Sequence, residues 1–464
     1  MDEIIYASAS ELARAIRRGE VSSAEVVEAH LSHIEQVNPR LNAVVHLTAD
    51  AARRRAREAD EARGRGEEWG PLHGVPVTIK DAFETAGVVS AGGTGGRAAY
   101  VPEEDAAGVA RLKAAGAVVL GKTNVPEISL AFESDNLVYG RTHNPYDLTR
   151  TPGGSSGGEG AAVASGMSPL GLGSDAGGSI RVPAHFCGVA GLKPTSGRTP
   201  RTGHFPPMGG LLDSIWQIGP LARRVEDLAL ALPLLCGTDW RDPTVAPVPL
   251  GDHREVGLKG LRVALHTDNG IVAPTEDIAA AARDAARVLA DAGAEVVEAR
   301  PPVPADAYGL LLGLYGADSG AGLRTLLMFS GTSETSPLMT RLLEILDATS
   351  LTAAELTGLV FQLDAWRSQM LSFMRDYDLI VCPPCARAAM PHGTTFDEGN
   401  QLFFSYTMIY NLTGWPGAVV RAGTSAKGLP LGAQFVARPW REDVALASAA
   451  EVERATGGWQ RPPL

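Results

Sequence analysis

The sequence predicts an α/β protein in which helices cover a sheet of short, buried strands. Two observations support this prediction. From Gly74 onward, short apolar runs alternate with glycine and proline, and residues 261–297 follow the order strand, helix, strand. Strands that are buried on both faces give continuous apolar runs instead of alternating ones, so covering helices are expected around this sheet.

The N-terminal segment, residues 1–70, is expected to be mostly helical. Two Ser-x-x-Glu patterns are typical of the capping boxes that begin helices: Ser8 with Glu11, and Ser22 with Glu25. Gly19 is suited to end the first helix, and Asn38-Pro39 is expected to end the second. Residues 49–63, rich in Ala, Arg and Glu, are expected to form a third helix.

The predicted strands are apolar runs separated by glycine and proline. In chain order they are residues 75–79, 118–120, 170–172, 261–266 and 294–297. The covering helices include residues 106–115 and 274–292, and residues 304–375 are expected to be predominantly helical. Within that region, four side chains predict one buried helical segment: Leu342, Leu343, Ile345 and Leu346. The polar, proline-rich stretch 237–256 is typical of a surface loop.

The composition is that of a soluble globular protein. The chain has 464 residues, of which 45% are hydrophobic and 20% charged. Its formal net charge of −12 disfavours a nucleic-acid partner, which needs a basic patch. Residues 1–5 lack the basic flank of a secretory signal, and the longest apolar runs, 228–236 and 310–315, are far shorter than the roughly 20 residues that span a bilayer. With four cysteines, a reducing, cytoplasmic location without a membrane partner is expected.

Two serines lie in glycine-rich stretches, and a lysine ends an apolar run upstream of them. Ser155 lies in Gly-Gly-Ser-Ser-Gly-Gly at 153–158, Ser179 lies in Gly-Ser-Asp-Ala-Gly-Gly-Ser-Ile-Arg at 173–181, and the lysine is Lys80. Glycine lets the backbone turn sharply and aim N–H groups at a ligand atom. Serine is a weak nucleophile that needs a base, and a desolvated lysine is one of the few alternatives to histidine. These residues predict a serine–lysine hydrolase.

The same segments resemble the amidase signature family. The matching runs, in the family's order, are 74–81, 151–158, 173–181, 186–188, 191–195, 213–223 and 411–416. The resemblance implies one α/β/α sandwich around a large mixed β-sheet, although the chain is longer than the usual single-core limit of roughly 250–300 residues. The implied parts of this single amidase domain, 1–464, are an N-terminal helical segment (1–70), a catalytic core (71–225), a variable substrate-pocket region (240–400) and a C-terminal return to the core (401–464).

The resemblance also implies a catalytic triad of Lys80, Ser155 and Ser179. Ser179 is the expected nucleophile, and Ser155, which follows a cis peptide bond in the family, is expected to pass the proton to Lys80 and later to the leaving amine. Lysine ordinarily titrates near about 10.4, so burial must lower the pKa of this base. The N–H groups expected to stabilise an oxyanion belong to Ala176, Gly177, Gly178 and Ser179. Supporting roles are expected for Ser156, Asp175 and Arg181.

The expected reaction is hydrolysis of a carboxylic amide through an acyl-serine intermediate. The family accepts aryl, acyl and oligomeric amides as well as carbamates, so a urethane or an ester is an alternative substrate. A second hypothesis is the glutamine-hydrolysing amidase subunit of a tRNA-dependent amidotransferase. Val182, where that subunit usually carries glutamine, and residues 202–207 argue against it. We expect a small-molecule substrate, no cofactor, no metal, and a monomer or homodimer.

Two literal motif matches point to other folds but fail in context. Residues 116–123 fit the phosphate-loop pattern, yet the positions that should form the loop are Ala-Val-Val-Leu, an apolar run typical of a strand. Residues 153–157 fit the nucleophile-elbow pattern of α/β-hydrolases. That elbow requires an apolar strand directly before it, whereas residues 143–147 have the composition of a loop.

Overall fold

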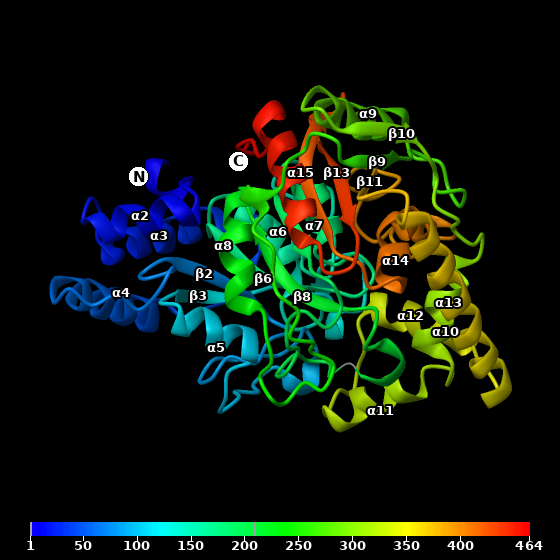
Figure 1. Cartoon of the computed structure of the whole chain (residues 1–464). Helices are drawn as coiled ribbons and strands as arrows, with labels where there is room; N and C mark the ends of the chain where they lie inside the picture. Colours follow the sequence, from blue (N-terminus) through cyan, green and yellow to red (C-terminus); the bar gives the residue numbers. More distant parts are fainter. Residues whose placement is uncertain (1, 208) are drawn as a thin grey trace.

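The computed structural model describes residues 2–207 and 209–464, and its centre is a large β-sheet (Figure 1). Within these residues, the sheet has 11 strands in the order β1-β3-β2-β6-β8-β7-β12-β13-β11-β9-β10. Their bounds are β1 Val44–Leu47, β2 Pro76–Lys80, β3 Val118–Thr123, β6 Leu170–Asp175, β7 Ala190–Lys193, β8 Gln217–Ala222, β9 Arg262–Leu265, β10 Glu295–Glu298, β11 Leu379–Cys382, β12 Gly417–Thr424 and β13 Pro430–Ala437. A separate small ribbon joins β4 (Asp135–Asn136) to β5 (Gly140–Arg141).

The sheet mixes parallel and antiparallel pairs. β2 runs parallel to both β3 and β6, and β9 runs parallel to both β10 and β11. The strands between these two groups pair antiparallel, as does β1 with β3 at one edge. Because β2 and β6 are parallel neighbours, their carboxyl ends lie at the same edge of the sheet, and the loops that follow both strands meet there.

Helices cover both faces of the sheet. Along β11, Leu379 and Val381 belong to one apolar cluster, and Ile380 belongs to another on the opposite face. The first cluster takes residues from α2 (Ala9–Arg18), α5 (Ala107–Ala114), α8 (Val225–Leu235), α9 (Glu276–Asp291) and α15 (Glu442–Thr456). The clusters on the other face take residues from α3 (Ser23–Leu41), α4 (Ala49–Gly64), α6 (Gly157–Ala164), α7 (Arg181–Cys187) and α14 (Ser405–Leu412). These layers confirm the predicted α/β/α sandwich around a mixed sheet.

Further helices lie on the side of the molecule that carries α14, and one of them, α11 (Ala321–Phe329), lies apart from α14 at the lower end (Figure 1). They are α10 (Ala307–Gly316), α11 (Ala321–Phe329), α12 (Pro337–Asp347) and α13 (Ala353–Met374). The chain starts with α1 (Asp2–Ile5), and short 3₁₀ turns occur at Gly95–Arg97, Glu127–Ser129, Gly210–Leu212, His253–Glu255 and Asn400–Phe404. The N-terminal and C-terminal segments contact each other, with the ring centres of Tyr6 and Trp459 5.5 Å apart.

Most local predictions are confirmed. Ser8 and Ser22 both form complete capping boxes, and Gly19 ends α2 with a φ of 73°. Residues 261–297 form β9, α9 and β10, with the two strands parallel. The stretch 237–256 contains, among the described residues, only the 3₁₀ turn His253–Glu255.

Two local predictions are wrong. The second helix, α3, does not end at Asn38-Pro39 but continues for two residues beyond the proline, to Leu41. Asn42, with a φ of 51°, ends the helix and donates its N–H to the Asn38 carbonyl at 2.7 Å. In α12 only Leu346 of the four predicted apolar side chains is buried, since this helix lies at the outer side of the fold and leaves the rest half-buried.

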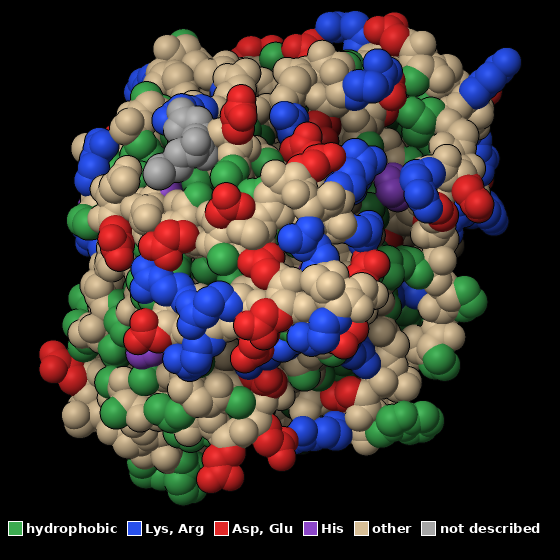
Figure 2. Space-filling view, turned by 90° about the vertical axis from the view of Figure 1, so that its left-hand side faces the viewer, with side chains coloured by type: hydrophobic (Ala, Val, Ile, Leu, Met, Phe, Trp, Pro, Cys, Tyr) green, Lys and Arg blue, Asp and Glu red, His purple; other side chains and the backbone are tan. Residues whose placement is uncertain are grey.

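The surface carries both charges. Figure 2 shows Lys and Arg side chains interspersed with Asp and Glu over one face. Among the described residues, no helix combines the length and the apolar character that a membrane span requires.

Candidate active site

Lys80 is the last residue of β2, and its side chain is fully buried. Its Nζ donates hydrogen bonds to Ser155 Oγ at 2.6 Å and to Ser174 Oγ at 2.9 Å. Burial lowers the pKa of Lys80 to about 7, although the carboxyl groups of Asp175 and Glu159 act in the opposite direction. A substantial fraction of this lysine is therefore neutral near pH 7, as a general base must be.

Ser155 lies in the glycine-rich loop that leads into α6. The Gly154–Ser155 peptide bond is cis, as the resemblance implied. A Cβ atom on Gly154 would lie 2.6 Å from both the Ala131 carbonyl oxygen and the Glu133 nitrogen, so only glycine fits against that backbone. This close packing holds the Ser155 hydroxyl over the end of β2, where it meets Lys80.

Ser179 lies between the end of β6 and the start of α7, and 8% of it is exposed. Its carbonyl oxygen accepts the Ser156 N–H at 3.1 Å, which ties the two serine loops together. No hydrogen bond joins the hydroxyls of Ser155 and Ser179 in the described part of the chain. The preceding Gly178 has a φ of 133°, and a Cβ atom there would lie 2.3 Å from Thr407 Oγ1, so glycine is required at this position.

The predicted oxyanion donors differ in how they are used. The Gly178 N–H donates to Asp175 Oδ1 at 2.8 Å. This predicted oxyanion donor therefore already has an acceptor within the protein. The N–H groups of Ala176, Gly177 and Ser179 have no acceptor among the described residues. Three of the four predicted donors are thus available to a ligand in this arrangement.

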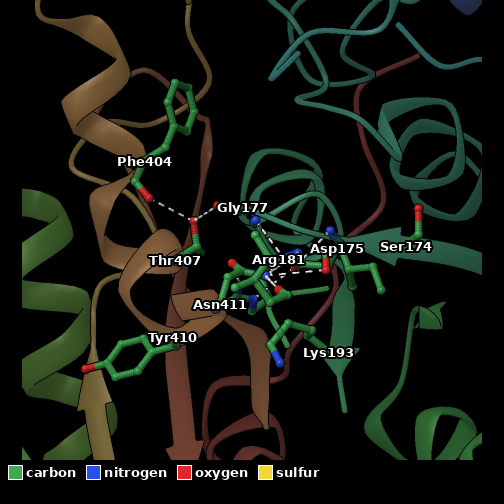
Figure 3. Close-up of polar contacts among 12 residues, drawn as sticks. Ser174, Asp175, Gly177, Arg181, Lys193, Phe404, Thr407, Tyr410 and Asn411 are labelled. Carbon is green, nitrogen blue, oxygen red and sulfur yellow. Dashed lines mark hydrogen bonds and ion pairs between the residues drawn. The ribbon is translucent and has the colours of Figure 1, made fainter. Parts of the chain in front are cut away.

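Asp175 and Arg181 form a buried, bidentate ion pair that supports the glycine loop (Figure 3). Arg181 Nε and Nη2 donate to the two Asp175 oxygens, each at 2.9 Å. Burial alone would raise the pKa of Asp175, but the Arg181 guanidinium outweighs that effect and holds this pKa below its usual range. The Ile180 N–H also donates to this carboxylate at 3.1 Å, so the pair fixes the loop that carries Ser179.

Two further residues complete this cluster. Asn411 accepts from Arg181 Nη2 at 2.5 Å and donates to Asp175 Oδ1 at 2.8 Å, and Gln434 accepts from Arg181 Nη1 at 2.8 Å. Asn411 lies in a run that matched the family, but no role was predicted for it, and no sequence signal marked Gln434. Ser156, predicted as a supporting residue, donates its hydroxyl to the Ser174 carbonyl at 3.2 Å.

Glu159 lies beneath Lys80 and is fully buried. Its carboxyl oxygens lie 2.6 Å from Thr78 Oγ1 and 2.9 Å from Thr123 Oγ1. Burial raises the pKa of Glu159 to about 8, and the two threonine hydrogen bonds only partly oppose this. The carboxyl group is therefore mostly protonated near pH 7, which leaves Lys80 without a full negative charge directly below it.

A cavity opens in front of Ser179, and its enclosed volume is about 90 Å³. Its wall is mainly apolar and aromatic: Leu130, Ala131, Phe132, Tyr308, Leu311, Leu312, Tyr315, Leu342, Phe396 and Met408, with Ser129, Ala176, Gly177, Ser179 and Gln401. No Lys, Arg, Asp or Glu side chain is among these described lining residues. This enclosed space is smaller than the roughly 300–1,000 Å³ of an ordinary small-molecule pocket.

The comparisons with known proteins agree with this fold. The chain matches the family model named Amidase over residues 25–446, and it belongs to the amidase signature family. It is 35% identical to a glutamyl-tRNA(Gln) amidotransferase subunit of Chloroflexus aggregans, over 100% of this chain and 99% of that protein. It is 37% identical to the protein of the same name from Anaeromyxobacter sp. (strain K), over 96% and 95% of the two chains.

Solved structures with the same fold include amide hydrolases. The 6-aminohexanoate cyclic dimer hydrolase complexed with its substrate aligns with a TM-score of 0.88 and 30% identity, covering 99% of both chains. A bacterial aryl acylamidase of the amidase signature family aligns with a TM-score of 0.86 and 28% identity, covering 97% of this chain and 96% of the other.

Proposed function

We propose that this protein hydrolyses a carboxylic amide bond through an acyl-Ser179 intermediate, with Lys80 as the base. One observation carries the proposal: buried Lys80, with a pKa near 7, is hydrogen-bonded to Ser155 beside Ser179, which opens onto an apolar cavity. A lysine held partly neutral next to a serine hydroxyl is the arrangement that an activated serine nucleophile needs.

The proposed proton path combines the Lys80–Ser155 hydrogen bond with a Ser179–Ser155 hydrogen bond that forms when substrate is bound. As Ser179 Oγ attacks the substrate carbonyl carbon, its proton moves to Ser155 Oγ while the Ser155 proton moves to Lys80 Nζ. The same path in reverse delivers a proton to the leaving amine, and a water molecule then releases the acyl group. The free N–H groups of Ala176, Gly177 and Ser179 are the donors for the developing oxyanion, and one such donor contributes roughly 3–4 kcal/mol to the transition state.

The cavity favours a substrate with an apolar acyl or aryl group. Aromatic side chains such as Phe132, Tyr308 and Phe396 provide large contact areas without charge. A charged group would lose its hydration in such a wall without gaining an ionic partner. We therefore place neutral amides first, with carbamates (urethanes) and esters as chemically related substrates, and expect a cytoplasmic monomer or homodimer without cofactor or metal.

The second candidate is the glutamine-hydrolysing subunit of a tRNA-dependent amidotransferase. The curated relatives favour it, since those at 35–37% identity over nearly the whole chain carry the name of a glutamyl-tRNA(Gln) amidotransferase. The cavity favours the first candidate, because the ammonium and carboxylate groups of free glutamine would find no charged partner among the lining residues described. Val182 and residues 202–207 also differ from that subunit. In the second role, the chain would work in a complex, on tRNA.

One experiment separates the two candidates. The purified chain is assayed for ammonia release from glutamine, and for turnover of a matched panel of an anilide, an acyl amide, a carbamate and an ester, with Ser179→Ala as the control for each. Turnover of the panel without glutaminase activity supports the first candidate. Ammonia from glutamine alone supports the second, and activity that survives Ser179→Ala contradicts both.

A further inference from the structure

His204 lies buried behind the second hydrogen-bond partner of Lys80. Its Nε2 is 2.9 Å from Ser174 Oγ, and its Nδ1 is 3.0 Å from the Pro206 carbonyl oxygen. His204 forms an isolated β-bridge with Phe83, and the Phe83 ring lies edge-on to the imidazole with the ring centres 5.1 Å apart. The centre of the Trp216 ring lies 4.6 Å from the centre of the imidazole. This packing fixes the imidazole in one orientation, with its Nε2 directed at Ser174.

These contacts determine where the protons are. A carbonyl oxygen only accepts hydrogen bonds, so the Nδ1 of His204 carries the proton that points to Pro206. Burial lowers the pKa of His204 to about 3, with a further contribution from the charge of Lys80, so the ring is neutral and Nε2 is an acceptor. The single hydroxyl proton of Ser174 is therefore donated to His204. Ser174 Oγ can then only accept from Lys80.

The direction of these hydrogen bonds constrains the neutral form of Lys80. A neutral amine has two N–H donors and one lone pair. One N–H is bound to Ser174, whose own proton is engaged elsewhere and cannot occupy the lone pair. The lone pair is left for the hydroxyl proton of Ser155, at 2.6 Å.

We propose that His204, acting through Ser174, is a positioning residue that directs the lone pair of Lys80 to Ser155. The inference rests on the proposed function, because it concerns the base of that reaction. Figure 3 shows that Ser174 points away from the cluster of Asp175 and Arg181, although Ser174 and Asp175 are neighbours at the end of β6. One strand end therefore serves two tasks: Asp175 holds the nucleophile loop, and Ser174 orients the base.

The first test replaces the imidazole by a ring without an acceptor. In His204→Phe the Ser174 proton is free to turn to Lys80 and compete with Ser155 for its lone pair. We expect kcat on an anilide to fall roughly ten- to hundredfold, the range found when the hydrogen-bond partners of metal-ligating residues are removed, while KM stays unchanged. His204→Gln, whose Oε1 can reach Ser174, should restore most of the lost rate. His30→Phe is the control, because His30 is also buried, with its Nδ1 2.8 Å from the Val26 carbonyl oxygen.

A double-mutant cycle gives a readout that a general loss of packing would not produce. Ser174→Ala removes the hydroxyl through which His204 acts, so adding His204→Phe to it should lower kcat no further. Equal factors in both backgrounds would overturn the inference, as would a change confined to KM. Should His204→Phe fail to fold, His204→Asn replaces it in the cycle, since its shorter amide cannot reach Ser174.

Failure of this inference is distinguishable from failure of the proposed function. If Lys80→Ala retains activity, the base itself is wrong. If Lys80→Ala is inactive and His204→Phe keeps the kcat of the parent enzyme, only the role of His204 is wrong.

Discussion

Two buried lysines at the ends of neighbouring parallel strands differ in one respect, which is the kind of partner each one meets. Lys80 ends β2 and Lys122 lies near the end of β3, with Ile79 opposite Lys122 in the register. Because side chains alternate along a strand, the two lysines point to opposite faces of the sheet. Lys80 reaches the serine loops, whereas Lys122 reaches the Asp81 carboxylate at 3.7 Å.

The partners set the protonation of each lysine. Burial lowers the pKa of both, to about 7 for Lys80 and to about 8 for Lys122, whose nearest opposing charge is Asp81. Lys122 also donates to the Ser90 hydroxyl at 3.0 Å and to the Phe83 carbonyl. An adjacent carboxylate favours the charged form, so we expect Lys122, beside Asp81, to be structural, and Lys80, beside the Ser155 hydroxyl, to be the base. The residue type and the burial are the same, so the two lysines are distinguished by the groups that each one contacts.

The largest expected effect separates the two lysines by activity. Lys80→Ala should lower the turnover of an anilide by several orders of magnitude, because no base remains to accept the nucleophile's proton. Lys122→Ala, measured on the folded fraction, should lose far less. The measurement is kcat for both variants beside Ser179→Ala. Similar losses for the two lysines would remove the functional distinction between them.

The next effect tests the hydroxyl partner of Lys80. Ser155→Ala breaks the proton path while Ser179 and the oxyanion donors remain, so the rate on an amide should fall roughly 10²–10⁴-fold. An activated ester needs less help at its leaving group, so the loss on a matched p-nitrophenyl ester should be smaller. Both rates are measured on the same preparation. Equal losses on the two substrates would indicate a distorted glycine loop instead of a lost relay.

The predicted triad lies in short, glycine-rich or apolar motifs. The loops around Ser155 and Ser179 and the end of the strand at Lys80 are local patterns. Lys80 and Ser179 follow the parallel strands β2 and β6, which end at one edge of the sheet, and the loop before α6 places Ser155 against Lys80. The capping boxes were equally local. The predicted helix end at Pro39 was two residues too early, because the helix ends at Asn42, whose left-handed backbone and N–H bond to the Asn38 carbonyl close the last turn.

Residues that converge from distant parts of the chain could not be predicted. Asn411 and Gln434 meet Arg181 across 230 and 253 positions, and neither lies in a periodic pattern that would indicate the contact. His204 belongs to a segment that served only as evidence against one function. The cavity wall joins separate loops and helices, so its apolar character became visible only in three dimensions. The exposure of α12 was missed for the same reason.

A third effect concerns stability. Lys122→Met leaves the buried Asp81 carboxylate without its ionic partner, which typically costs about 3–5 kcal/mol of unfolding free energy. Lys80→Met leaves no such charge behind and should cost much less. Denaturant unfolding at pH 7 measures both. A larger loss for Lys80→Met than for Lys122→Met would reverse the assignment of the structural lysine.

The smallest expected effect is the pH dependence of the rate, which tests whether Lys80 is the base. Only neutral Lys80 accepts a proton, so kcat/KM for an anilide should fall by about tenfold per pH unit below the pKa of this lysine and level off above it. The bend should lie near pH 7, because burial lowers the pKa of Lys80 to about that value.

The carboxyl groups that raise the pKa of Lys80 are Asp175 and, in its ionised fraction, Glu159, whereas Lys122 has no direct effect on it. Lys122→Met should therefore keep the bend in place, even though it weakens the fold. A rate that does not change between about pH 6 and 9, with chemistry shown to limit turnover, would contradict a lysine base. A bend that moves in Lys122→Met would show that Lys122 influences the pKa of Lys80. The groups in contact with each lysine would then not be enough to explain their different roles.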